Sequence, residues 1–307
     1  AAPLITGLFA AWKPPFRRRR KGDSRISGLP ATGGAFPRPP EAPFPLSTNY
    51  EETMLLKDKK CLIFGVANNR SIAYGIASCF KEQGARLAFS YAGEAIHKRV
   101  EPISEELGGE FIFPCDVTSD EDIAAAAALV KEKWGSVDVL VHSVAFANRE
   151  DLTKRFIETS RDGFATALNV SAYSLTALCH AFEPMLNPGA SVLTMTYYGA
   201  QKIITNYNVM GVAKAALEAS VRYLSVDLGA KGVRINAISA GPIKTLASSG
   251  ISDFKLIFNH IEEHAPLRRN VTTEDVGKAA VFLASDLGSA VTGEVMFVDC
   301  GYNNMGI

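Results

Sequence analysis

From residue 54 onward, short apolar runs alternate with longer amphipathic stretches. Near-continuous Val, Ile, Leu and Phe content is typical of parallel strands covered on both faces, and strands that alternate with helical patterns indicate βαβ units. We predict seven buried strands, at residues 60–66, 85–90, 110–113, 137–143, 191–196, 233–239 and 295–298. The pattern therefore predicts a single α/β domain at 54–307, a doubly wound parallel sheet of seven strands with helices on both faces.

Residues 1–53 do not share this pattern. The first fifty hold nine of the fifteen prolines and the basic run Arg17–Arg20, a composition that does not bury a core. The first methionine is Met54, immediately before the first predicted strand. We expect a disordered leader, spurious or dispensable to the folded domain. The alternatives are an organelle targeting peptide, which its proline content fits poorly, and a basic tethering arm.

Charge and cysteine content exclude several function classes. The chain has no formal net charge, yet its first fifty residues carry a net of +6, so the remainder carries −6. An acidic folded part argues against nucleic-acid binding.

The five cysteines are far apart with no Cys-x-x-Cys pair, which predicts reduced thiols in a cytoplasmic protein and no metal site. No apolar run approaches ~18 residues, so we expect no membrane span.

The first strand ends in a turn suited to a dinucleotide pyrophosphate. Gly65 begins this turn, Ser71 is a plausible helix cap, and Ile72 and Gly75 follow in the helix. Free amides and the helix dipole bind phosphate at such a turn in Rossmann-like folds. The middle glycine of G-x-G-x-x-G is missing, so a plain strand–loop–helix turn is an equal alternative. We expect Gly75 to let the helix approach the strand.

Later strand ends supply further cofactor candidates. The second strand ends at Ala92 with neither the acid that binds a ribose nor the arginine that binds a 2′-phosphate, so these residues do not decide between NADH and NADPH. Asp116, followed by Val117, could bind the adenine amino group or simply form a turn. Val144 follows the fourth strand at the crevice where ligands bind. After the turn at Gly241–Pro242, the expected cofactor contacts are Ile243, Lys244, Thr245, Leu246 and Ala247.

Tyr207 and Lys214 are seven residues apart in a predicted helix. At about 100° per residue, seven steps nearly complete two turns, so both side chains project from one face. Such a pair can divide the work, with the ammonium holding cofactor hydroxyls and the phenol meeting a substrate carbonyl. Tyr198 and Lys202 have the commoner Tyr-x3-Lys spacing, but they start at a strand end and include Gly199, so we assign them no catalytic role. We interpret His142 as a packed strand residue.

Together these motifs resemble the bacterial enoyl-acyl-carrier-protein reductases, a divergent group of the short-chain dehydrogenases/reductases. The similarity runs from about Leu55 to the C-terminus, and its most specific element is Tyr-x6-Lys. It is carried by Gly65…Ser71-Ile72-Ala-Tyr-Gly75, Cys115-Asp116-Val117, Tyr197-x9-Tyr207-x6-Lys214 and Ile238-Ser-Ala-Gly-Pro-Ile-Lys-Thr245.

The resemblance implies reduction of a trans-2-enoyl thioester in the fatty-acid elongation cycle, with NADH as the expected donor and NADPH as the alternative. It implies that Tyr207 donates to the developing enolate oxygen, that Lys214 holds the nicotinamide ribose, and that Tyr197 and Ala147 line the acyl site with Tyr207. It further implies an acyl carrier protein as partner, a homotetramer, and a mobile substrate flap at 246–264.

Two other functions remain open from the residues alone. An ordinary short-chain ketoreductase or alcohol dehydrogenase would need Tyr-x3-Lys on the helix after the fifth strand. A dinucleotide sensor without catalysis would not need the Tyr207–Lys214 pair.

Overall fold

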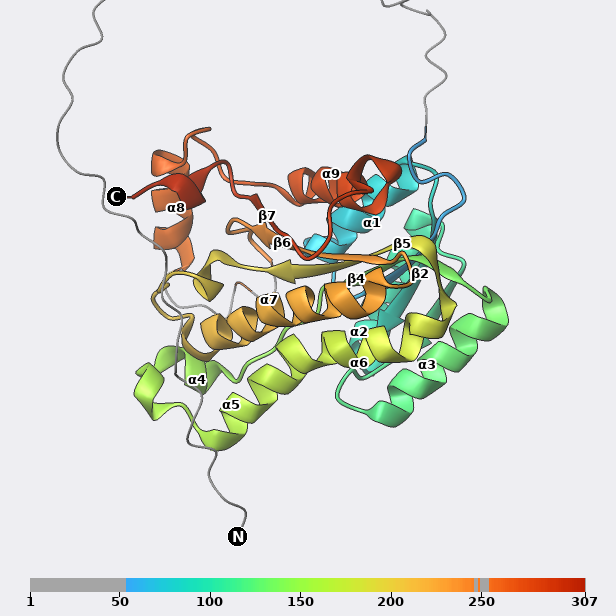
Figure 1. Cartoon of the computed structure of the whole chain (residues 1–307). Helices are drawn as coiled ribbons and strands as arrows, with labels where there is room; N and C mark the ends of the chain where they lie inside the picture. Colours follow the sequence, from blue (N-terminus) through green and yellow to red (C-terminus); the bar gives the residue numbers. More distant parts are fainter. Residues whose placement is uncertain (1–53, 246–247, 249–253, 307) are drawn as a thin grey trace, which may run out of the picture. The chain divides into compact units, whose positions relative to one another are not determined.

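The computed structural model describes residues 54–245, 248 and 254–306. The predicted leader at 1–53 therefore lies outside the described residues. All neighbouring strands of the sheet pair in parallel, in the order β3-β2-β1-β4-β5-β6-β7 (Figure 1). The strands are β1 (Lys60–Phe64), β2 (Arg86–Tyr91), β3 (Phe111–Pro114), β4 (Val137–His142), β5 (Leu186–Thr196), β6 (Arg234–Ala240) and β7 (Val295–Val298). The predicted seven-stranded, doubly wound parallel sheet is confirmed.

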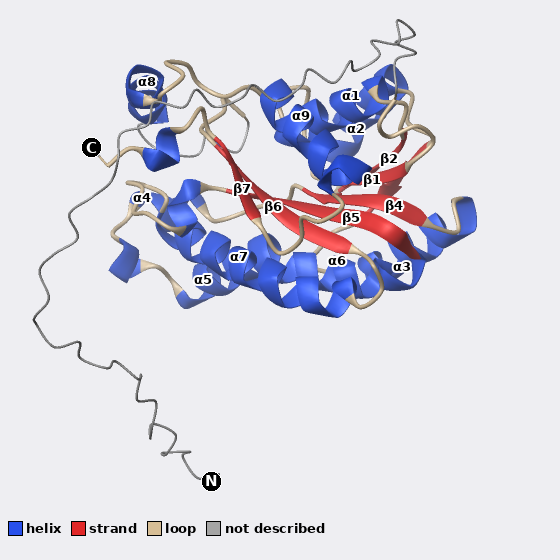
Figure 2. Ribbon diagram, turned by 45° about the horizontal axis from the view of Figure 1, so that its top comes forward, coloured by secondary structure: helices blue, strands red, loops and turns tan. Residues whose placement is uncertain are grey.

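Helices cover both faces of this sheet (Figure 2). One face carries α1 (Ile72–Glu82), α2 (Glu94–Leu107) and α9 (Thr273–Ala284). The opposite face carries α3 (Asp120–Lys133), α5 (Arg161–Leu168), α6 (Ser174–Phe182) and α7 (Asn208–Gly229). Two further helices, α4 (Arg149–Thr153) and α8 (Phe254–His264), lie beyond the carboxyl ends of the strands (Figure 2).

Alternation along β1 divides the core into two clusters. Cys61 and Ile63 belong to the cluster under α1, α2 and α9, whereas Leu62 and Phe64 belong to the cluster under α3, α6 and α7. Successive side chains of a strand point to opposite faces, so the buried residues of β1 contribute alternately to both clusters. The Phe64 ring packs edge-on against Phe113 and Phe182, at centroid distances of 5.8 Å each.

The chain changes direction in the sheet at β1, which has β2 on one side and β4 on the other. In doubly wound sheets, ligands bind at the carboxyl ends of the strands on either side of such a reversal. Gly65 opens the loop after β1 with φ +100°, and a Cβ there would lie 2.1 Å from the carbonyl oxygen of Ser143. Only glycine permits this backbone conformation and this close approach.

Gly75 has a different role from the one we expected. A Cβ on Gly75 would lie 2.5 Å from Cβ of Thr273 in α9, and no β1 atom is among its nearest neighbours. On the facing helix, a Cβ on Gly277 would meet Cys79 Sγ at 2.5 Å. The two glycines bring α1 close to α9, so the prediction that Gly75 serves helix–strand packing was wrong.

None of the helices in the described ranges is long and apolar enough to cross a membrane.

Candidate active site

Tyr207 stands immediately before α7, as its N-terminal capping residue, and is 8% exposed. Its neighbours Asn206 and Asn208 have φ of 62° and 37°, a left-handed conformation that asparagine tolerates better than most residues. The sequence predicts Tyr207 inside the helix, whereas in the structure it lies one residue before the first residue of α7. The Tyr207 ring packs edge-on against Tyr197 at the end of β5, with centroids 5.0 Å apart.

Burial keeps both tyrosines protonated. It raises the pKa of Tyr197 to about 12, and it raises the pKa of Tyr207 further beyond the ordinary range, with Tyr197 adding to the effect. The Tyr207 hydroxyl makes no hydrogen bond to another described residue. A neutral phenol in this state can donate to a ligand oxygen at any physiological pH.

Lys214 lies on α7 with its side chain buried, and its Nζ donates to the carbonyl oxygen of Met195 in β5, 2.7 Å away. Burial lowers the pKa of Lys214 to about 8, while the negative charge of Glu218, one turn further along α7, acts in the opposite direction. An ammonium has three donor hydrogens. Met195 takes one and leaves two for a ligand.

Glu218 was missed in the sequence analysis. Its carboxylate is buried and accepts hydrogen bonds from Thr196 Oγ1 at 2.8 Å and Gln201 Nε2 at 3.3 Å. It therefore holds the end of β5, next to Tyr197, and adds negative charge near Lys214. The available signal was its spacing of four residues from Lys214, which puts both on one helix face.

The second tyrosine–lysine pair has no such arrangement. Tyr198 begins a short 3₁₀ helix, Tyr198–Ala200, and its hydroxyl donates to the carbonyl oxygen of Asn303. Lys202 is exposed beyond that helix. The two do not share the face of a regular helix, as the sequence indicated.

His142 is a fully buried strand residue, as predicted. Its Nδ1 lies 2.8 Å from Thr194 Oγ1 and its Nε2 lies 2.8 Å from Ser174 Oγ. Ser174 donates its own proton to the carbonyl oxygen of Val170, so we assign the ring proton to Nε2. Burial, together with the charge of Lys214, lowers the pKa of His142 to about 3, which keeps the ring neutral.

The region where the sequence predicts a bound pyrophosphate is built around Gly65 and α1. Gly65 brings the loop after β1 against Ser143 and Val144, because its Cβ position lies 3.2 Å from the Val144 nitrogen. Ser71 caps α1 by accepting from the backbone N–H of Tyr74 at 3.3 Å, which confirms the predicted cap, and Ile72 starts the helix. No acid lies in the first turn of α1. The positive end of its dipole is therefore free for an anion.

The adenosine candidates are more loosely defined. Ala92 is exposed after β2. Asp116 accepts through Oδ1 from both N–H and hydroxyl of Thr118, at 2.9 and 2.8 Å, which is the turn geometry named as the alternative. Oδ2 takes part in no hydrogen bond among the described residues and stays available as an acceptor. The Val117 side chain is buried in the core, so only its backbone could reach a cofactor.

After β6, the predicted contacts separate. Ile243 is half-buried against the core, and the exposed Lys244 places Nζ 4.2 Å above the Phe258 ring of α8. Thr245 Oγ1 accepts from the Ser248 N–H at 3.1 Å, so this hydroxyl already has a partner. Leu246 and Ala247 lie outside the described residues.

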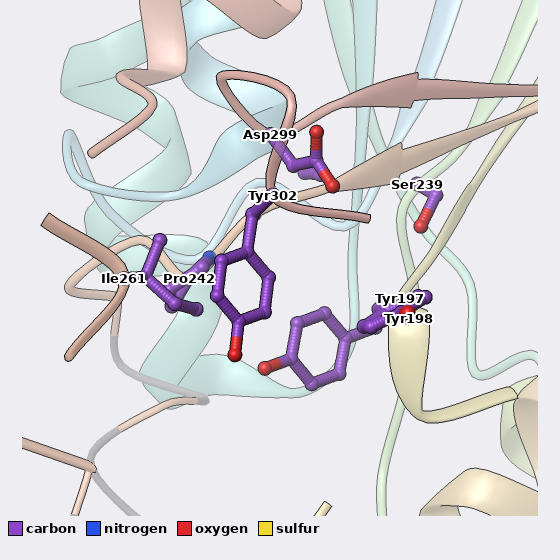
Figure 3. Close-up of a pocket in the computed structure, with 9 residues that line it drawn as sticks. Tyr197, Tyr198, Ser239, Pro242, Ile261, Asp299 and Tyr302 are labelled. Atoms are coloured by element: carbon purple, nitrogen blue, oxygen red, sulfur yellow. The ribbon is translucent and has the colours of Figure 1, made fainter. Parts of the chain in front are cut away.

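A pocket opens at the carboxyl ends of β5, β6 and β7, close to Tyr197 (Figure 3). In Figure 3, Tyr302 directs its hydroxyl toward the tyrosines at the end of β5. Tyr302 was missed by sequence reasoning, although its place after the last strand puts it at this edge. The lining residues are Tyr197, Tyr198, Ser239, Ala240, Gly241, Pro242, Ile261, Asp299 and Tyr302.

Residues 65–303 match the protein family described as Enoyl-(Acyl carrier protein) reductase. The chain belongs to this family. It is 54% identical over 253 residues to enoyl-[acyl-carrier-protein] reductase [NADH] 1 of Rhizobium meliloti, an alignment that covers 82% of this chain and 93% of that protein. The resemblance stated from the motifs is thereby confirmed.

Solved structures agree with this family assignment. The Bacillus cereus enoyl-acyl carrier protein reductase, crystallised with NADP+ and indole naphthyridinone, superposes with a TM-score of 0.81 at 50% identity, covering 82% of this chain and 99% of that one. The Anaplasma phagocytophilum enzyme, in complex with NAD, gives 0.80 at 50% identity and covers 83% and 97%.

In this family member, the tertiary structure brings together two sets of predicted residues. Tyr197, Tyr207 and Ala147 share one small apolar cluster, completed by residues of α4, α5 and α7. Gly65 and Val144 are neighbours at the carboxyl ends of β1 and β4.

Proposed function

We propose that this chain reduces trans-2-enoyl thioesters carried by acyl carrier protein, with NADH as donor, in fatty acid biosynthesis. The observation that carries the proposal is the buried Tyr207, packed edge-on against the partly buried Tyr197 and two helical turns before the buried Lys214 of α7. Among the described residues, the Tyr207 hydroxyl has no hydrogen-bond partner. Family membership and relatives named as NADH-dependent reductases support the reaction and the cofactor.

The residues present fit a dinucleotide. The uncompensated N-terminus of α1, the glycine turn at Gly65 and the two remaining hydrogens of Lys214 supply donors for phosphates and ribose. When bound, the reduced nicotinamide supplies the hydride for the β-carbon of the substrate. We infer cofactor roles for Gly65, Ser71, Ile72, Ala92, Asp116, Val117, Val144, Lys214 and the segment 243–247.

Tyr207 acts on the other reacting centre. Hydride addition to the β-carbon moves negative charge onto the thioester oxygen, and a donor placed for that oxygen stabilises the charge. The Tyr207 hydroxyl donates this hydrogen bond, and the nearby positive charge of Lys214 strengthens the effect. Tyr197 and Ala147, packed in the same cluster as Tyr207, form the wall of the acyl site. The relatives named as NADH-dependent reductases support NADH over NADPH as the donor.

We also infer a homotetramer and a cytoplasmic location. Exposed apolar side chains on α5, the segment after it and α7 support subunit contacts: Phe164, Tyr173, Val212, Tyr223 and Val226. The five cysteines are all buried free thiols, which suits a reducing compartment. Light scattering of the purified chain tests the tetramer. We further propose that 54–307 is the catalytic unit.

One assay tests the reaction. NADH oxidation is followed with crotonyl-CoA or a longer 2-enoyl thioester, and then with a β-ketoacyl thioester. We expect turnover with the enoyl substrate only. Turnover of the β-ketoacyl thioester alone would indicate an ordinary ketoreductase, and NADH binding without either activity would indicate a sensor.

A further inference from the structure

Asn208, the first residue of α7, bonds to a helix that lies far from it in sequence. Its side-chain Nδ2 lies within hydrogen-bond distance of three backbone carbonyl oxygens at the end of α4: Lys154 at 2.6 Å, Leu152 at 3.1 Å and Asp151 at 3.3 Å. The last carbonyls of a helix lack partners inside that helix. One amide from α7 therefore caps the C-terminal end of α4.

This contact joins two walls of the candidate site. Helix α4 follows the loop that carries Ala147, and Leu152 of α4 belongs to the same apolar cluster as Tyr207, with Tyr197 and Ala147 packed against that cluster. Asn208 directly follows Tyr207 in the chain. The hydrogen bonds to α4 therefore hold the backbone that carries Tyr207 against the segment that faces its ring.

The chemistry of asparagine suits both demands of this position. The residue has φ 37°, which asparagine tolerates and most side chains do not. Its amide also brings two N–H donors to a group of carbonyls, whereas aspartate would bring only acceptors. Glycine would satisfy the backbone but offer no donor.

We propose that Asn208 is a positioning residue for Tyr207: by capping α4 from the start of α7, it fixes the phenol relative to the acyl-site wall. The proposal rests on the proposed function. Asn208 touches neither substrate nor cofactor in this scheme and acts through Tyr207.

The test compares three variants in the full-length protein. Asn208→Gly keeps the left-handed backbone and removes all three hydrogen bonds, and Asn208→Asp keeps the shape but replaces the donors with a charged acceptor. The control is Asn187→Ala. It removes the hydrogen bond of 2.8 Å from Asn187 Nδ2 to Asp138 Oδ1, which lies at the amino ends of β4 and β5, the ends opposite to the candidate site. With crotonyl-CoA and NADH, we expect kcat to fall at least tenfold in both Asn208 variants, NADH affinity to stay within twofold, and Asn187→Ala to keep its turnover.

A second measurement separates positioning from general support of the fold. If Asn208 acts through Tyr207, then adding Asn208→Gly to Tyr207→Phe should lower kcat by less than twofold, because the group being positioned is already gone. Full kcat in Asn208→Gly would overturn the proposal. So would a parallel loss of NADH affinity, or full additivity with Tyr207→Phe. Failure of the proposed function itself is recognised differently, since the unaltered protein would then bind NADH without reducing the enoyl thioester.

Discussion

At the scale of single residues, the site depends on keeping one group neutral and another charged. Burial raises the pKa of Tyr207 and lowers that of Lys214, because a dry environment disfavours the charged form of each. The phenol thus stays a hydrogen-bond donor, while the ammonium stays charged only up to about pH 8.

Replacing Tyr207 with phenylalanine removes only its donor hydroxyl. We expect Tyr207→Phe to lower kcat by ~10²–10³ without loosening NADH, since one such donor typically contributes that much to rate. Tyr198→Phe is the matched control, because its hydroxyl bonds to Asn303; it should cost less than threefold. Steady-state kinetics and NADH titration measure both. The opposite ranking would favour the Tyr-x3-Lys group of reductases.

The charge of Lys214 should appear in the pH profile. With its pKa lowered to about 8, the ammonium is present below that pH and is lost as pH rises through it, whereas an ordinary lysine stays charged to about 10. We therefore expect kcat/KM for NADH to fall above pH 8. Glu218→Gln removes the negative charge that raises this pKa, so the alkaline limb should move to lower pH. An unmoved limb in Glu218→Gln would exclude this electrostatic role.

At the scale of elements, a short π-helical segment, Asn169–Tyr173, joins α5 to α6. Within it, the buried Ser171 holds both polar groups of the Phe146 backbone. Its hydroxyl accepts from the Phe146 N–H at 3.0 Å and donates to the Phe146 carbonyl oxygen at 3.1 Å. One side chain therefore fixes the loop after β4, directly beside Ala147.

Removing that hydroxyl should loosen the acyl-site wall. Ser171→Ala leaves an N–H and a carbonyl of Phe146 without this partner, so we expect KM for the enoyl thioester to rise several-fold and the free energy of unfolding to fall by about 1–3 kcal/mol. Ser220→Ala serves as control, because Ser220 donates to Ala216 within α7 and lies away from the loop. Kinetics and denaturant unfolding measure the two effects. Equal KM values in the two variants would contradict the role given to Ser171.

At the scale of the whole molecule, the composition of the chain changes ahead of Met54: the first fifty residues hold nine of the fifteen prolines, a composition that does not bury a core. The residues from Met54 onward form the sheet and the clusters on its two faces. We expect a chain starting at Met54 to fold and to turn over substrate at the rate of the full chain. Activity of the truncated protein and its unfolding midpoint test this. A tenfold loss of activity, about 1.4 kcal/mol in barrier, would assign residues 1–53 a role in the reductase.

The local pattern of apolar and polar residues was enough to predict the seven strands, the glycine turn at Gly65 and the Tyr207–Lys214 spacing. Such features depend only on residues that are close together in the sequence. The strand boundaries differ from the prediction: β5 begins at Leu186, five residues before the predicted start at 191. The intervening Asn187-Pro188-Gly189 consists of turn-forming residues, which do not follow the apolar pattern that predicts a buried strand.

Other features were decided only by the tertiary structure. Gly75 packs against Thr273, Asn208 caps α4, and Glu218 holds Thr196. In each case the residue's partner belongs to a different element, and no periodicity in the sequence predicts which surfaces the fold will bring together. The sequence by itself determined the architecture and the spacing of the candidate pair Tyr207 and Lys214. Packing between distant elements decided how that pair is held.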